Sequence, residues 1–274
     1  MGTHDTFEAF RKFEHEGWLA VAKEYGDSFG SLTTQAAQPL LNATEAGFGT
    51  RLLDIACGPG YVAATASKLG AIVTGLDFSA TMIQLAREHH SDVEFVEGDA
   101  ENLPFPSGMF GAVTINFGML HFAHPDRVLL EAFRVLKPGG KLAYTAWATP
   151  EKAEVLGIVS RAIEKHGNMN VHLPPAQPVF RFSDHHESVA AMQSAGFINN
   201  LVVEIPMVWH LPSVNAILTA MHDATVRTRQ LLRSQTAEVL SKIRQTIAEE
   251  TRHYQTATGA EIPMIAVLSS GRKP

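Results

Sequence analysis

The residues best suited to chemistry lie in a glycine-rich turn, residues 54–60 (DIACGPG), which follows an apolar run. Such a turn lets backbone N–H groups approach a ligand closely, and the helix expected after it presents a positive N-terminal end to that ligand. The spacing from Gly58 through Gly60 to Ala63 satisfies a nucleotide-binding pattern, and Asp77 follows about 20 residues later, where a ribose-binding acid is expected. The turn and this acid predict a site for a nucleotide-containing ligand.

Two kinds of ligand fit this pattern: a dinucleotide and S-adenosylmethionine (SAM). Asp54, at the end of the first expected strand, would repel a pyrophosphate, whereas its carboxylate suits a ligand that carries an α-ammonium and a sulfonium. Tyr61 and Val62 make the start of the helix bulky for close contact with a pyrophosphate. The chain contains no Tyr-x-x-x-Lys pair, which argues against an NAD-dependent oxidoreductase. These features favour SAM.

The turn also resembles the first motif of class I SAM-dependent methyltransferases, and further motifs of that family follow in order over residues 51–147. The resemblance implies that Asp77, in VTGLDFS, accepts hydrogen bonds from both ribose hydroxyls. It also implies that Asp99 and Ala100, in GDAENLPF, recognise adenine, the carboxylate meeting the exocyclic amine and the alanine N–H meeting a ring nitrogen. Ala56 departs from an all-glycine motif but still permits close approach of the backbone.

Further contacts to the cofactor are expected around these motifs. Phe78 and Met82 would face the adenine ring, although core packing explains Met82 equally well. Asn116 ends the fourth expected strand, and the small side chain of Cys57 would pack under the turn. Tyr25, on the helices before the first strand, would contact the cofactor's carboxylate or the substrate. The expected cofactor-binding residues are Tyr25, Asp54, Ala56, Cys57, Gly58, Gly60, Asp77, Phe78, Met82, Asp99, Ala100 and Asn116.

One histidine is the best candidate for a general base. His121 follows the fourth strand, and an imidazole there could take a proton from a hydroxyl, a phenol or a carbon acid; fixing the local loop is the alternative role. Methyl transfer is an in-line displacement on an activated carbon, which leaves S-adenosylhomocysteine (SAH), so a base is needed only where the acceptor must lose a proton. The adjacent pairs at 89–90 and 185–186 lie on expected helices, where neighbours point apart, so no metal site is expected.

The elements that must position these residues alternate strand and helix, as a doubly wound α/β sheet does. We expect a Rossmann-like, mostly parallel sheet of seven strands, whose last strand is antiparallel and lies at the edge. Ser79 should cap the helix after the second strand, Pro125 should open the helix after the fourth, and a helix at 184–195 should follow Ser183 and end at Gly196. The expected strands are 51–56, 71–77, 93–97, 110–117, 140–147, 197–206 and 262–272.

The chain divides into a core and a helical cap. The cap should close over the substrate cleft at the carboxyl ends of the strands, where open α/β sheets bind ligands. A helical hairpin is expected in the insertion at 207–258. It could instead mediate dimerisation, so the sequence leaves open whether the protein is a monomer or a homodimer. The expected segments are an N-terminal helical cap (1–50), the SAM-binding core (51–206) with an insertion at 150–182, a helical cap insertion (207–258) and the final edge strand (259–274).

Composition limits the acceptor and the location. The chain of 274 residues has 22 Lys and Arg against 28 Asp and Glu, and the basic residues are scattered. Nucleic-acid enzymes need phosphate contacts, which appear as basic stripes, so we expect a small-molecule acceptor and no nucleic acid. No apolar run approaches the length of a membrane span, and the N-terminus lacks the apolar core of a signal peptide, so we expect a cytoplasmic protein without a membrane partner.

The leading hypothesis is therefore a SAM-dependent methyltransferase that acts on a small molecule. Its plan resembles that of bacterial quinone C-methyltransferases and natural-product O-methyltransferases. Two alternatives stay open: a protein that binds SAM on the same fold without transferring methyl groups, and an NAD-dependent oxidoreductase. The acceptor, and the choice between O-, N- and C-methylation, stay open as well.

Overall fold

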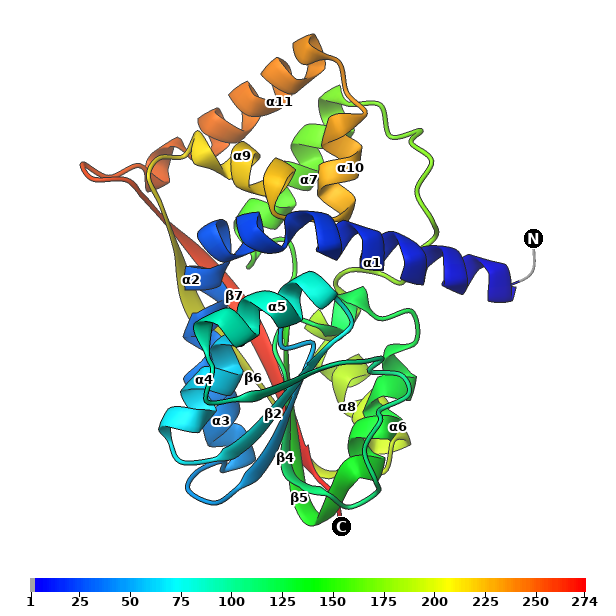
Figure 1. Cartoon of the computed structure of the whole chain (residues 1–274). Coiled ribbons are helices and arrows are strands. Elements are labelled where there is room, and N and C mark those ends of the chain that lie inside the picture. Colours follow the sequence, from blue (N-terminus) through cyan, green and yellow to red (C-terminus); the bar gives the residue numbers. More distant parts are fainter. Residues whose placement is uncertain (1–2) are drawn as a thin grey trace.

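Residues 3–274, which the computed structural model describes, fold around one seven-stranded sheet with helices on both faces (Figure 1). The strand order is β3-β2-β1-β4-β5-β7-β6, and the neighbours from β3 to β5 are parallel. The predicted Rossmann-like, doubly wound α/β class is confirmed. The strands are β1 (Arg51–Ile55), β2 (Ile72–Asp77), β3 (Glu94–Glu97), β4 (Phe110–Ile115), β5 (Leu136–Trp147), β6 (Ile198–Leu211) and β7 (Ala260–Arg272).

The last strand lies inside the sheet, so the prediction that it forms the edge was wrong. β7 pairs antiparallel with β5 on one side and with β6 on the other. β6 is the edge strand, and its pairing with β7 extends to Leu211, beyond the predicted end at residue 206. This pairing gives the backbone groups of residues 207–211 their partners. Those residues therefore belong to the core and not to the cap insertion.

Helices bury both faces of the central strands. On β1, Leu52 packs into an apolar cluster with Ala63 of α4, whereas Leu53 packs into the opposite cluster with Val128 of α6. This alternation places Asp54 on the same face as Leu52. None of the helices in residues 3–274 has the length and apolarity to cross a membrane. The helices are α1 (Thr3–Ser28), α2 (Gly30–Thr33), α3 (Ala37–Thr44), α4 (Tyr61–Lys68), α5 (Ala80–His89), α6 (Pro125–Val135), α7 (Glu154–His166), α8 (His185–Ser194), α9 (Ala216–Asp223), α10 (Arg227–Arg233) and α11 (Ala237–Glu250).

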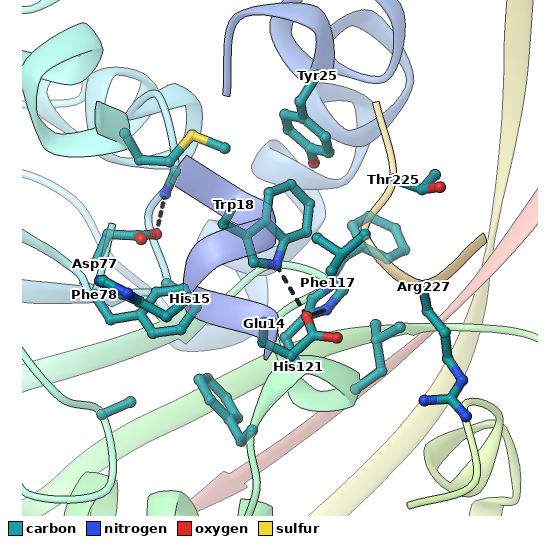
Figure 2. Close-up of a pocket in the computed structure, with 18 of the residues that line it drawn as sticks. Glu14, His15, Trp18, Tyr25, Asp77, Phe78, Phe117, His121, Thr225 and Arg227 are labelled. Carbon is teal, nitrogen blue, oxygen red and sulfur yellow. Dashed lines mark hydrogen bonds and ion pairs between the residues drawn. The ribbon is translucent and has the colours of Figure 1, made fainter. Parts of the chain in front are cut away.

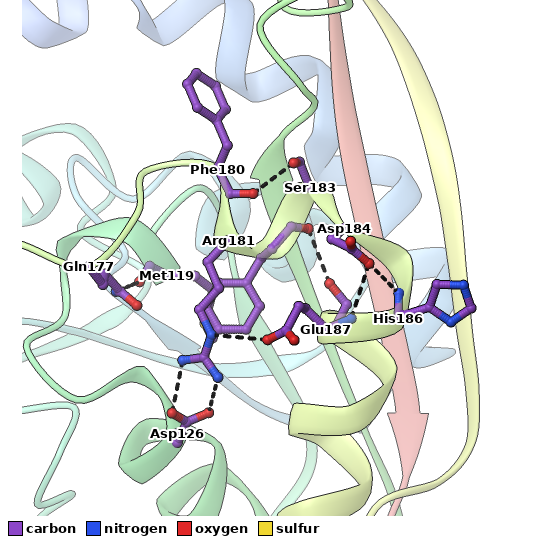
Figure 3. Close-up of polar contacts among 11 residues, drawn as sticks. Met119, Asp126, Gln177, Phe180, Arg181, Ser183, Asp184, His186 and Glu187 are labelled. Atoms are coloured by element: carbon purple, nitrogen blue, oxygen red, sulfur yellow. Dashed lines mark hydrogen bonds and ion pairs between the residues drawn. The ribbon is translucent and has the colours of Figure 1, made fainter.

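Local signals set the ends of most helices as predicted. The Ser79 hydroxyl accepts a hydrogen bond from the first turn of α5, and Pro125 is the first residue of α6. The N-cap of α8 is Asp184 and not Ser183, because the Asp184 carboxylate accepts two backbone N–H groups of the first turn at 2.7 and 3.2 Å (Figure 3). Gly196 follows α8 with a φ of 99°, which suits glycine.

Three helices, not a hairpin, follow β6 and form the cap. α11 packs against α7 from the first insertion, and α1 touches both α9 and the core helix α5 (Figure 1). An irregular loop after α7 returns to the core. There Arg181 forms a bidentate ion pair with Asp126 of α6, with N–O distances of 2.8 and 2.9 Å (Figure 3). α1 therefore lies between the sheet and the cap.

Candidate active site

A cavity of about 1080 Å³ opens at the carboxyl ends of β1, β2 and β4, beneath α1 and the cap (Figure 2). Sites for one small ligand run from about 300 to 1,000 Å³, so this cavity can hold a cofactor together with a second molecule. Of the predicted cofactor-binding residues, all except Gly60 line it, and so does His121. The lining members are Tyr25, Asp54, Ala56, Cys57, Gly58, Asp77, Phe78, Met82, Asp99, Ala100 and Asn116.

The glycine turn is shaped by packing as much as by access to a ligand. Gly60 has a φ of 87°, and a Cβ there would lie 2.8 Å from the ring of Phe95. Ala56 adopts a φ of 53°, a conformation that costs an L-residue about 1–2 kcal/mol. The N–H of Gly58 donates to Asp77 at 2.9 Å. This N–H therefore orients the carboxylate of Asp77, the predicted ribose-binding acid.

Asp77 is held rigidly at the end of β2. Its two oxygens accept the N–H groups of Gly58 and Ser79, both at 2.9 Å. Burial raises the pKa of Asp77, and the two N–H groups oppose that shift. Each carboxylate oxygen has a second lone pair, so the side chain can still accept two hydroxyl donors from the cavity.

Asp54 is the most constrained acid of the site. Its side chain is 1% exposed, and Oδ1 accepts the hydroxyl of Thr114 at 2.8 Å. Its Oδ2 atom accepts no hydrogen bond of ordinary geometry from residues 3–274, and the backbone N–H of Ala63 is a weaker donor to this carboxylate. Burial raises the pKa of Asp54 to about 7. A buried carboxylate oxygen without such a hydrogen bond is stabilised by a cation.

Asp99 is engaged by a residue that sequence reasoning missed. Arg11 on α1 donates to Asp99 at 2.6 Å and to the buried carboxylate of Glu101 at 2.7 Å. The second oxygen of Asp99 accepts the Glu101 N–H at 2.8 Å. Arg11 therefore ties α1 to the predicted adenine turn. Its separation from Asp99 along the chain, 88 residues, left no local signal for this contact.

His121 belongs to a second group that the sequence did not reveal. The Nδ1 atom of His121 lies 2.8 Å from Oε2 of Glu14, and the same oxygen accepts the indole N–H of Trp18 at 3.2 Å (Figure 2). Glu14 is 3% exposed, and the indole of Trp18 stands edge-on to the imidazole at 4.9 Å. The four-residue spacing of Glu14 and Trp18, which puts both on one face of α1, was the only signal present.

Two predicted contacts are already hydrogen-bonded within the protein. The Tyr25 hydroxyl donates to Thr33 at 3.2 Å, and burial raises the pKa of Tyr25 to about 12. The Asn116 amide donates to the Thr33 carbonyl at 3.0 Å and accepts the Thr145 hydroxyl at 2.7 Å. Both side chains thus link the segment around α2 to the wall of the cavity.

Three more of the predicted residues, Phe78, Met82 and Cys57, are apolar and line the part of the cavity expected to hold the cofactor. The ring of His15 from α1 meets Phe78 edge-on at 5.4 Å, so Phe78 lies beneath this helix (Figure 2). Met82 is buried and also lines the cavity, so core packing and a ligand-facing position coexist. Burial raises the pKa of Cys57 well above its usual value, so the side chain is a neutral thiol.

Two further histidines, His210 and His222, lie away from this chemistry, whereas His15 lines the cavity beside Phe78. His210 is exposed and 4.0 Å from Glu261, and His222 pairs with Asp223 at 2.7 Å. Neither lines the cavity. Within the described part of the chain, no three His, Cys, Asp or Glu side chains are grouped as metal ligands would be.

Comparison with known proteins decides the family. A family profile described as "Methyltransferase domain" matches residues 53–144. The demethylmenaquinone methyltransferase of Thermus thermophilus is 36% identical over 163 residues, which cover 54% of this chain and 74% of that protein. The chain belongs to the methyltransferase family. Membership confirms SAM as the cofactor of this site and overturns the dinucleotide alternative.

Other relatives match a shorter part. The demethylmenaquinone methyltransferase of Renibacterium salmoninarum is 40% identical over 102 residues, 37% of this chain and 43% of the relative. The ubiquinone/menaquinone biosynthesis C-methyltransferase of Pseudomonas putida is 38% identical over 128 residues, 43% of this chain and 48% of the relative. This methyltransferase chain thus spans less than half the length of these two relatives.

Solved structures support the fold. Phosphoethanolamine N-methyltransferase 2 of Haemonchus contortus, solved with S-adenosyl-L-methionine, has a TM-score of 0.56 at 20% identity, covering 97% of this chain and 60% of that one. The cyclase SpnF has a TM-score of 0.51 at 20% identity, covering 88% and 80%. At such identity the likeness concerns the fold alone. The names of these two proteins describe different reactions, so proteins with this fold catalyse different chemistry.

Proposed function

We propose that this protein transfers the methyl group of SAM to a small-molecule acceptor. The observation that carries the proposal is Oδ2 of Asp54, a buried carboxylate oxygen on the cavity wall that accepts no hydrogen bond of ordinary geometry from residues 3–274. It suits the α-ammonium of SAM, and the remaining lone pairs of Asp77 suit the two ribose hydroxyls. SAM, when bound, supplies an activated methyl carbon and departs as SAH. The volume of the cavity leaves room for the acceptor beside it.

We assign the role of general base to His121, positioned by Glu14. An ionised glutamate only accepts hydrogen bonds, so its contact to Nδ1 assigns the ring hydrogen to Nδ1 and leaves the Nε2 lone pair free to take a proton. The carboxylate also stabilises the imidazolium that forms, as in other acid–histidine pairs. A base is needed only for an acceptor that loses a proton, so this pair supports O- or C-methylation at an acidic position.

The second candidate is a SAM-binding protein that does not transfer methyl groups. The fold relationship to a protein named as a cyclase favours testing it. Binding and turnover separate the two candidates, because both require SAM binding and only the first consumes SAM.

The test begins with calorimetric titration of SAM and SAH into the protein, followed by incubation with methyl-labelled SAM and a cell extract. Saturable binding and label in the small, organic-extractable fraction are expected. Asp77→Ala should weaken SAM binding by about 100-fold or more and reduce the label transferred. Asp92→Ala, which removes an exposed aspartate bonded to Ser67, should change neither. Failure to bind SAM or SAH would refute the proposal. Saturable binding with no label transferred would favour the second candidate.

A further inference from the structure

One cationic side chain of the cavity has no anionic partner. Arg11, Lys12 and Arg227 are the Lys and Arg residues that line the cavity. Arg11 binds two carboxylates, as described above, and Lys12 lies 3.8 Å from Glu16. Arg227, at the start of α10, forms no ion pair with any side chain that the structure describes. Its one hydrogen bond runs from Nη1 to the carbonyl of Pro174 at 2.9 Å.

The surroundings of Arg227 make a guanidinium without a counter-charge unfavourable. The side chain is half-buried, and the cavity wall includes the apolar residues Leu156, Met221, Ala224 and Leu231 as well as the hydroxyl groups of Thr225 and Thr228. A desolvated guanidinium without a counter-charge is unfavourable. Since Arg has five N–H donors and one serves Pro174, a planar pair of donors stays available to a ligand. A carboxylate matches that pair with two parallel hydrogen bonds.

Aromatic side chains line the same cavity as Arg227 and the base. Trp18 and Phe117 face the same space as His121 and Arg227 (Figure 2), and Phe117 stacks on Trp147 with ring centroids 4.1 Å apart. Flat aromatic surfaces of this kind pack well against a ring system. The wall thus offers a base, a guanidinium and aromatic rings that line one cavity.

We propose that the acceptor is an aromatic carboxylic acid whose carboxylate pairs with Arg227 and whose ionisable hydroxyl reaches His121. The inference rests on the proposed function, because it assigns the acceptor of the same site. An enzyme that selects a neutral aromatic hydroxyl compound would gain nothing from Arg227. Its bound acceptor would leave the guanidinium without a counter-charge, which weakens binding.

The test measures binding of two probes that differ only in the carboxylate, 6-hydroxy-2-naphthoate and 2-naphthol, by calorimetry on the full chain saturated with SAH. In the naphthoate the hydroxyl and the carboxylate lie at opposite ends of the ring system. The wild type should bind the naphthoate about tenfold or more tighter than the naphthol, as expected for a charge-assisted pair. Arg227→Met should remove this preference by weakening the naphthoate alone, and Arg227→Lys should restore part of it. Arg233→Met, which removes the same charge from an exposed position on α10, should leave the preference unchanged.

Three results would overturn the inference: equal or tighter binding of naphthol to the wild type, an undiminished preference in Arg227→Met, or no binding of either probe to the SAH-saturated protein. Equal weakening of both probes in a folded Arg227→Met protein would assign Arg227 a structural role through Pro174 and overturn it as well. If Arg227→Met does not fold, the wild-type comparison and Arg227→Lys still decide. Failure of SAH itself to bind would count against the proposed function instead.

Discussion

Replacing Asp54 with asparagine should change how the stability of the ligand-free protein depends on pH. Asp54 is buried, and burial raises its pKa from 3.8 to about 7. Between these two values the folded protein keeps a proton that the unfolded chain has released. The free energy of unfolding therefore falls as the pH rises through this window, by up to about 1.4 kcal/mol per pH unit.

The size of the effect follows from the two pKa values. Ionised Asp54 is disfavoured by roughly 4 kcal/mol relative to an exposed aspartate once the pH exceeds about 7. Between pH 5 and pH 7 the loss should be roughly 2–3 kcal/mol. Asparagine keeps an oxygen that can accept the Thr114 hydroxyl and has nearly the same shape, but it does not titrate. Other titrating groups are common to both proteins and largely cancel in the comparison.

Urea unfolding of the wild type and of Asp54→Asn at pH 5, 6, 7 and 8 measures this difference. The stability of the wild type relative to the variant should decrease from pH 5 to pH 7 and level off above it. SAH affinity should behave in the opposite way: in the wild type it should weaken below pH 7, where a proton competes with the ligand's ammonium, and in the variant it should be low throughout. A stability difference that stays constant from pH 5 to pH 8 would refute the reasoning.

Four further substitutions test other parts of the site. Asp77→Ala should weaken SAM binding by about 100-fold or more, measured by calorimetry, because two hydrogen bonds to a charged acceptor are lost; a loss under tenfold would contradict its role. Glu14→Gln and His121→Gln should leave the dissociation constant of SAH within about twofold while lowering kcat, by about 100-fold for His121→Gln. Unchanged turnover would exclude His121 as the base. Gly60→Ala should lower the free energy of unfolding by about 1–3 kcal/mol, since the added methyl would meet Phe95 at 2.8 Å with a φ of 87°; unaltered urea unfolding would count against it.

Features that depend on neighbouring residues could be read directly from the sequence. The glycine turn, the acid at the end of β2 and the Ser79 cap all arise from short sequence patterns. Such patterns predicted seven strands, the parallel core and a cavity lined by most of the predicted cofactor residues. The error at α8 was also local: Asp184 and Ser183 are both good capping residues, and only the chain path selects between them.

The tertiary structure alone decided the contacts that join distant parts of the chain. Glu14 and His121 are 107 residues apart, and they meet only because α1 crosses the carboxyl ends of the strands. The inner position of β7 depends on which strands offer free backbone groups, a property of the whole sheet. The place of Arg227 on the cavity wall, with no carboxylate of the described residues paired to it, was likewise visible only in the tertiary structure. Sequence patterns determined the elements and the cofactor end, because those follow from local chemistry, whereas the orientation of the base and the acceptor end arose from packing between elements that no local pattern encodes.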